Sequence, residues 1–277
     1  MFATTGTVVH IGPTQAVKSL DAAKWPSKGQ SVTFLVDASP TPYKLSHHGV
    51  FGNVTIEPSD PSKRPTFQLQ GTNYPTIYSN GMVTIKNINT IGGSKIILTG
   101  SNPHGSLDVE NVKMLDGGSV WNGQGVNSAY FKDNEVYGVP YDYVYANFTG
   151  VANKVVIDNS GTKVPVQQGS KEAAIRFMNV NDLTLKGVIT KPHYGSGGRI
   201  LKQDVQLRPS SRSFKIINCH FGIIDIGDMT WRKPALPVQN VTITDSILDK
   251  GVHITSGVGT VRIINTKVAG SIWNKTL

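Results

Sequence analysis

The sequence predicts an all-β protein built as a solenoid, in which one strand-and-turn unit repeats along most of the chain. The first observation is a recurring phrase of alternating β-branched or aliphatic residues that ends in Asn or a substitute, as in Val83–Asn87 and Val261–Asn265. The second is spacing, since a strand that recurs every 20–31 residues indicates stacked coils. The closing residues of the eight phrases are Asn87, Asn111, Asn134, Asn159, Gly187, Asn218, Asp245 and Asn265.

Composition agrees with a single domain of this kind. The chain has 277 residues, 38% of them hydrophobic, and its 29 Gly and 15 Pro suit many short strands joined by turns. We expect a cap region over residues 1–50 and coils over residues 51–277. No apolar run approaches the length of a membrane helix, so the sequence predicts a soluble protein with no membrane partner.

The N-terminal region is predicted to begin with a short amphipathic helix over residues 14–25. Thr14 can cap its start, Leu20 lies on its apolar face, and Pro26 ends it. A strand is expected at Val32–Val36. Because a solenoid exposes its core at both ends, a helix just ahead of the repeat suits a cap.

The coils that follow are expected to place equivalent side chains in columns. Val54–Ile56 opens the first recognisable coil and matches Val83–Ile85 one period later. A column of Asn side chains inside the coils can hydrogen-bond from coil to coil, and Gly187 would break it. Cys219, the one cysteine, is expected to be a small buried side chain rather than a reactive thiol.

The N-terminal helix, the 20–31 residue period and the Asn-terminated strands together resemble the pectate-lyase-like superfamily. This resemblance covers nearly the whole chain and implies a right-handed parallel β-helix. It is a likeness of fold, and one fold can carry many functions. Function therefore has to be argued from particular side chains.

Four segments with an apolar–polar–apolar core indicate where a site lies. Their middle residues should point outward and stack into one column. That column is Arg176, Gln206, Asp225 and His253. Residues expected beside it or at its rim are Asp204, Arg208, Asp228, Lys202 and Glu172. So many mixed charges on a few adjacent coils favour a functional site over a surface ion network.

Aromatic residues are expected on the same side in earlier coils, where they would hold sugar rings. These are Trp121, Tyr143 and Tyr145, with Tyr78 as a further candidate. Together with Gln206, Asp228 and Glu172 they form the predicted substrate-binding set. The alternation around Tyr143 and Tyr145 allows a shift by one residue, so aromatics that merely cover a coil edge are the alternative.

The net charge of +9 favours an acidic partner. No run of Lys and Arg exceeds two residues, which argues against nucleic acid and for an anionic polysaccharide. Residues Met1–Lys18 show no signal peptide, so we expect a secreted protein without a visible leader or a virion-associated one. The alternative function is a non-catalytic glycan-binding or structural β-helix, such as a phage tail or surface module, with a homotrimer expected for a virion component.

The leading prediction is a polysaccharide lyase acting on a uronic-acid polymer. Such an enzyme needs a base beside the sugar carboxylate and cations for the resulting enolate. The candidates for these roles are Arg208, Lys202, Arg176 and His253. The cofactor is either none or Ca²⁺ held by Asp204, Asp225 and Asp228.

Local motifs give only partial support to particular families. The segment Arg208–Arg212 resembles the Arg-x-Pro-x-x-Arg motif of pectate lyases but is one residue short. Gln203-Asp204 followed by Asp225 is similar to pectin methylesterases, a resemblance that implies Asp204 as acid/base and Asp225 as nucleophile. Glu172 stands where that family has an oxyanion-stabilising Gln, so the esterase remains an alternative. The aspartates can also supply the two carboxylates of a glycoside hydrolase, although the polygalacturonase motifs are missing.

Overall fold

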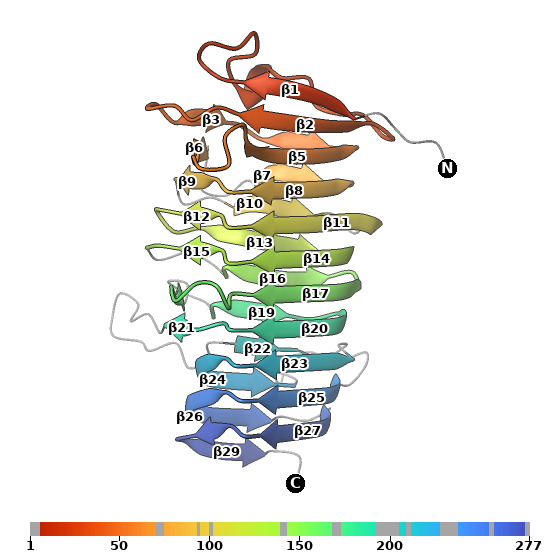
Figure 1. The fold of residues 1–277 in the computed structure, drawn as a ribbon. Coiled ribbons are helices and arrows are strands. Elements are labelled where there is room, and N and C mark those ends of the chain that lie inside the picture. The colour runs from red at the N-terminus through yellow and green to blue at the C-terminus, as the bar shows by residue number, and fades with distance from the viewer. Residues whose placement is uncertain are drawn as a thin grey trace.

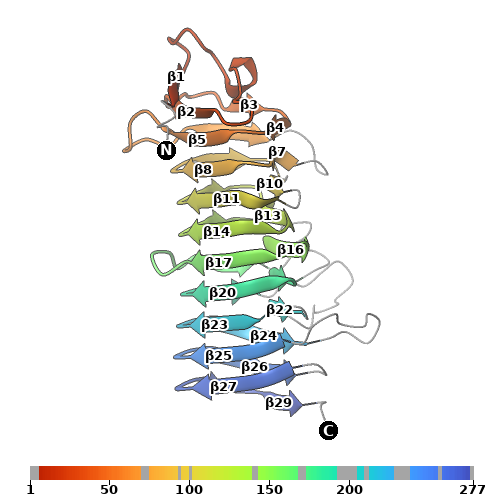
Figure 2. The ribbon, with the colours of Figure 1, turned by 90° about the vertical axis from the view of Figure 1, so that its right-hand side faces the viewer.

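The protein is a parallel β-solenoid whose two termini lie at opposite ends of the stack (Figure 1, Figure 2). The computed structural model describes residues 6–69, 75–92, 95–99, 102–138, 143–167, 173–191, 205–208, 212–227, 238–254 and 258–274. Strands of successive coils pair in parallel, as β1 with β2 over Thr7–Ile11 and Ser31–Val36. The predicted all-β solenoid is confirmed.

Three parallel sheets run along the solenoid, and within the described residues the two longest have 11 strands each. Sheet A contains β1 and β2 followed by β5 (Asn53–Pro58), β8 (Met82–Lys86), β11 (Asn102–Glu110), β14 (Val126–Lys132), β17 (Ala152–Asp158), β20 (Val180–Lys186), β23 (Ser213–Ile217), β25 (Val238–Thr244) and β27 (Val258–Ile264). Sheet B is shorter and contains β3 (Tyr43–Leu45), β6 (Thr66–Leu69), β9 (Asn89–Ile91), β12 (Lys113–Met114) and β15 (Glu135–Val136).

Sheet C lies across the core from sheet A and carries the predicted site. It contains β4 (His48–Val50), β7 (Pro75–Ser79), β10 (Lys95–Thr99), β13 (Ser119–Gln124), β16 (Tyr145–Thr149), β19 (Ile175–Phe177), β22 (Val205–Leu207), β24 (His220–Ile226), β26 (Ile247–Ile254) and β28 (Lys267–Val268), with β29 (Ser271–Asn274) beside β26. A separate two-stranded sheet pairs β18 (Val166–Gln167) with β21 (Thr190–Lys191).

Alternating side chains of sheet A form continuous columns inside the coils. One column runs through Phe34, Ile56, Ile85, Val109, Phe131, Ile157, Leu185, Ile216, Ile243 and Ile263. All are buried except Ile263, which lies in the last coil and is only partly covered. The core is therefore closed along the stack and open at its C-terminal end.

The repeated closing residue has a conformational role. Strand register aligns Asn87, Asn111, Asp133, Asn159, Gly187, Asn218, Asp245 and Asn265. All but Asn159 have a recorded positive φ, between 47° and 62°. Asn, Asp and Gly tolerate this left-handed conformation better than other residues. Gly187 therefore continues the column, contrary to the prediction that it breaks it, and the third member is Asp133 rather than Asn134.

Amide bonding between coils is limited at this position. The Asn111 side chain donates to Oδ1 of Asn87 at 2.7 Å, which is the contact that the sequence predicted for the whole column. Asn134 instead points into the core, where its amide donates to the carbonyl oxygen of Val109 at 2.8 Å and accepts from the Val112 N–H at 3.0 Å. The left-handed turn, more than an amide ladder, explains the recurring Asn.

Cys219 lies in the core directly after one of these turns. It is 3% exposed, and burial raises the pKa of its thiol to about 12. A thiol that stays protonated at neutral pH is a poor nucleophile. The prediction of a buried structural cysteine is confirmed.

The predicted helix over residues 14–25 is wrong. This segment contains one short 3₁₀ turn, Leu20–Ala22, and no α-helix. Val17 forms a parallel bridge with Ile11, so its backbone bonds to the neighbouring strand and not within a helix. The apolar pattern nevertheless marks burial, because Leu20 is fully buried and Trp25 packs on Phe34 at 5.2 Å between ring centroids. Among the described residues, no helix is long and apolar enough to cross a bilayer.

Replacing Gly187 by Ala is expected to lower the free energy of unfolding by about 1–3 kcal/mol. A Cβ there would lie 2.7 Å from Cα of Ser160, and φ is +62°. Gly29 is the matched control, because its φ is +81° with open space around a Cβ. Urea unfolding should show the larger loss for Gly187→Ala. Equal losses would mean that the turn at Ser160 adjusts without cost.

Candidate functional site

The predicted polar column forms on the outer face of sheet C. Strand register places Arg176 beside Gln206, Gln206 beside Asp225, and Asp225 beside His253. The column continues to Trp273 in β29, whose ring centroid lies 5.5 Å from that of His253. Sequence reasoning missed Trp273, which follows a Gly-Ser turn in the last, irregular coil.

Arg208 and Asp225 form a buried ion pair at the edge of this column. Their side chains are 3% and 6% exposed, and Nη1 of Arg208 lies 3.2 Å from Oδ2 of Asp225. The same nitrogen donates to the carbonyl oxygen of Gly227 at 3.3 Å. Burial lowers the pKa of Arg208, the Asp225 charge opposes that shift, and the charge of Arg176 adds to it. The two arginines therefore belong to one electrostatic cluster.

Arg176 is the partly exposed member of the cluster and is fixed by aromatic contacts. Its Nη1 donates to the hydroxyl of Tyr143 at 2.6 Å. Its guanidinium carbon lies 5.6 Å from the ring centroids of both Tyr143 and Phe148, within the range of cation–π attraction. Tyr143 and Phe148 pack with Ala146 and Ala173 in a small apolar cluster separate from the core.

The cluster has more hydrogen-bond donors than acceptors among the described residues. Nε of Arg176 and both Nε and Nη2 of Arg208 are buried without a hydrogen-bond partner. Buried N–H groups of this kind are costly unless an acceptor reaches them. Glu172, Lys202, Asp204 and Asp228, which were predicted nearby, lie outside the described residues. With Asp225 as the carboxylate paired to Arg208, the two guanidinium groups are suited to a further anion.

Two of the predicted surface aromatics are in the core, so their expected position was wrong. Trp121 and Tyr145 are both fully buried. Trp121 packs against Phe131 and Phe177 at 5.7 and 6.0 Å between ring centroids. Neither ring is open to a polymer on the outer face. The side chain of Tyr78 lies outside the described residues.

A repeated irregularity at the start of these strands explains the misplacement. The carbonyl oxygen of Val144 accepts from the N–H groups of both Val120 and Trp121, at 2.9 and 3.3 Å. The carbonyl oxygen of Ala174 accepts in the same way from Val144 and Tyr145. Two consecutive residues facing one partner is the geometry of a β-bulge. Both residues of each pair point into the main core, whereas Tyr143 belongs to the separate apolar cluster with Ala146 and Ala173, where it is 2% exposed and not open to a polymer.

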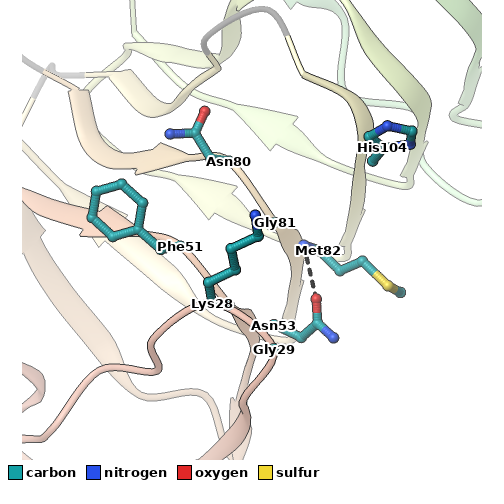
Figure 3. Close-up of a pocket in the computed structure, with 9 residues that line it drawn as sticks. Lys28, Gly29, Phe51, Asn53, Asn80, Gly81, Met82 and His104 are labelled. Carbon is teal, nitrogen blue, oxygen red and sulfur yellow. Dashed lines mark hydrogen bonds between the residues drawn. The ribbon is translucent and has the colours of Figure 1, made fainter.

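A groove at the N-terminal end of the solenoid was not predicted (Figure 3). It has a volume of about 540 Å³, and its side-chain walls include Lys28, Phe51, Met82 and His104. Phe51 and Met82 are 59% and 49% exposed. Oδ1 of Asn53 accepts from the Met82 N–H at 3.2 Å and fixes one wall. None of the described residues that line it is acidic.

The sequence signal for this groove is a pair of glycines. Gly52 and Gly81 each follow a sheet C strand by two residues, and a Cβ on Gly81 would collide with the carbonyl oxygen of Gly52. Close stacking of these two turns requires residues without side chains. The backbone of these two turns therefore forms the floor of the groove, between larger side chains.

The predicted calcium site rests largely on residues outside the described part of the chain. Asp204 and Asp228 are among them, and Asp225 is already paired with Arg208. Within the described ranges, no group of three or more His, Cys, Asp or Glu side chains is arranged to hold a metal ion. The calcium ligands therefore stay a prediction.

Comparison with known proteins adds no family to this picture. No protein family, no characterised protein and no solved structure matches the chain. The resemblance to pectate-lyase-like proteins and to pectin methylesterases stays a prediction. Function is therefore inferred from the side chains of sheet C.

Proposed function

We propose that the protein is a carbohydrate-active enzyme that binds an anionic polysaccharide on the outer face of sheet C and cleaves it by β-elimination. The observation that carries this proposal is the pair of guanidinium groups, Arg176 and Arg208, three of whose buried nitrogens have no hydrogen-bond partner in the described part of the chain. A planar guanidinium matches the geometry of a carboxylate. The net charge of +9 favours the approach of a polyanion.

Arg176 is the group best placed to meet a sugar carboxylate first. It is partly exposed, whereas Arg208 lies behind it and is 3% exposed. The aromatic rings of Tyr143 and Phe148 hold the Arg176 guanidinium in place, which reduces the entropy lost on binding. His253, in the same column, is partly exposed and is positioned to contact a neighbouring sugar unit.

β-Elimination needs few groups, and the cluster contains the main ones. A base removes the proton from the carbon beside the carboxylate, a carbon–carbon double bond forms, and the glycosidic carbon–oxygen bond breaks. The leaving oxygen then takes up a proton from the site or from water. Arg176 and Arg208 would stabilise the enolate charge. Tyr143, whose oxygen lies 2.6 Å from Nη1 of Arg176, is the proposed proton acceptor in its ionised, phenolate form.

A non-catalytic glycan-binding protein is the second candidate. The observation that favours it is the deep burial of Arg208 and Asp225, since a fixed pair of this kind also suits a purely structural role. The esterase alternative depends on Asp204, which lies outside the described residues. Binding without product formation would support the second candidate.

The test uses a panel of uronic-acid polymers, with absorbance of the unsaturated product as the readout. We expect product with at least one polymer, and a fall of about 10²-fold in kcat/KM for Arg176→Ala, because one charge-stabilising donor is lost. Lys215→Ala is the control, since Lys215 is exposed on β23 of sheet A, away from the cluster. Silence across the panel, with polymer masses unchanged, would exclude the lyase.

A further inference from the structure

The groove and the arginine cluster lie along the same edge of the solenoid. At this edge the strands of sheet C end and those of sheet A begin, on the right-hand side of Figure 1. Phe51 and Asn80 directly follow β4 and β7, and Arg208 directly follows β22. Backbone bonds from Asn80 to Val50 and from Arg208 to Phe177 show that these residues occupy the same step of the coil. The two places are therefore ends of one surface.

Exposed asparagines occupy the edge between them. In the register of sheet A, the column at this edge contains Gly52, Gly81 and Gly105, then Asn127, Asn153, Asn181 and Arg212. The Asn153 amide donates to Oδ1 of Asn127 at 3.0 Å, and that of Asn181 donates to Oδ1 of Asn153 at 3.0 Å. This Asn ladder continues the line from the glycine floor of the groove to Arg212.

We propose that this edge is a second contact region for the anionic polysaccharide, which extends from the arginine cluster across the Asn ladder into the groove. The inference rests on the proposed function, because it takes the same polymer as its ligand. From β22 to β4 there are six strand steps in sheet C, and at about 4.8 Å per step the path is roughly 29 Å. A chain of several sugar units is needed to cover it.

The chemistry of each part fits such a chain. Phe51 offers an exposed apolar face to a sugar ring, and Lys28 beside it offers a cation to a carboxylate (Figure 3). His104, in the irregular part of β11 between Asn102 and Ser106, adds an imidazole ring that can hydrogen-bond a sugar hydroxyl. The ladder amides both donate and accept hydrogen bonds, as sugar hydroxyls require. A groove whose described lining includes a cation and no acid selects an anionic ligand over a neutral one.

The experiment measures affinity as a function of ligand length. Polygalacturonate or alginate, whichever binds, is compared with its own trisaccharide by calorimetry. We expect the polymer to bind roughly 10²-fold more tightly per chain than the trisaccharide, because linked contacts add. Lys28→Glu, Phe51→Ala and Asn153→Ala should each remove most of this gain without changing trisaccharide binding. Lys215→Glu, with the same charge change on sheet A, should retain it.

The outcomes separate this inference from the proposed function. If trisaccharide and polymer bind equally well, or if the three edge variants behave like Lys215→Glu, the edge is no binding region and the arginine cluster stands alone. If neither ligand binds, both proposals fail together. Thermal unfolding of each variant establishes that the comparison is between folded proteins, and Phe51→Leu serves as a milder variant if Phe51→Ala unfolds.

Discussion

Arg208→Met is expected to lower the free energy of unfolding by about 3–5 kcal/mol. The reason is Asp225, whose side chain is 6% exposed and would lose the guanidinium that lies 3.2 Å away. The carbonyl oxygen of Gly227 would also lose its donor. Met fills much of the space of the Arg side chain without carrying a charge. The loss of unfolding free energy therefore comes mainly from the broken ion pair and less from a cavity. Urea unfolding followed by circular dichroism measures it.

The double variant Arg208→Met with Asp225→Leu is the informative control. Removing both charges leaves no unpaired carboxylate in the interior, so we expect it to be more stable than Arg208→Met alone. A loss below about 1 kcal/mol for Arg208→Met would mean that water reaches the pair as it does at a surface. That result would also remove the main reason for placing a second anion beside Arg208.

The regular part of this fold could be read directly from the sequence. Alternation within Val83–Asn87 and its counterparts is a local property, and stacking of parallel strands carries it from coil to coil. Register between neighbouring columns follows once each strand is placed. For that reason the column Arg176, Gln206, Asp225 and His253 was predicted correctly, although its strands are only a few residues long.

Irregular backbone set the limit of the prediction. The bulges before Trp121 and Tyr145 change which side of the sheet those rings face, and nothing in the alternation marks them. The Asn repeat was recognised but assigned to side-chain bonding, whereas φ values near +50° show a backbone requirement. Residues 14–25 have an amphipathic pattern, yet the bridge from Val17 to Ile11 binds them to the first strand. In each case, tertiary hydrogen bonds determine which of two locally possible backbone conformations the segment adopts.

In the candidate site, too, the features that depend on local sequence were predictable, and those that depend on tertiary contacts were not. Which residues point outward was predictable, but their burial was not, since the side chains of Arg208 and Asp225 are 3% and 6% exposed. The contact of Arg176 in β19 with Tyr143, just before β16, forms only because the bulge turns Tyr143 away from the main core. The groove near Phe51 depends on how closely the turns at Gly52 and Gly81 stack. This stacking is a property of the folded backbone that local sequence does not indicate.

Ile243→Ala is expected to cost about 2–5 kcal/mol of unfolding free energy, the range for large-to-small changes in a closed core. Ile243 is fully buried in β25, at the same step of the coil as Ile216 before it and Ile263 after it. Ile216→Ala should therefore cost a similar amount. Urea unfolding of Ile216→Ala, Ile243→Ala and Ile263→Ala compares the same substitution at one column position in three successive coils.

Ile263→Ala is the matched control, and we expect it to cost about 1 kcal/mol or less, since a partly exposed side chain has less apolar area to lose. Ile263 belongs to β27, the last strand of sheet A, and is only partly buried. In a stack where each coil contacts only its neighbours, a terminal coil lacks one of its two interfaces. A cost for Ile263→Ala equal to that for Ile216→Ala would show that this end of the core is covered in solution. Sedimentation over a range of protein concentrations would then tell whether a second copy of the chain covers it.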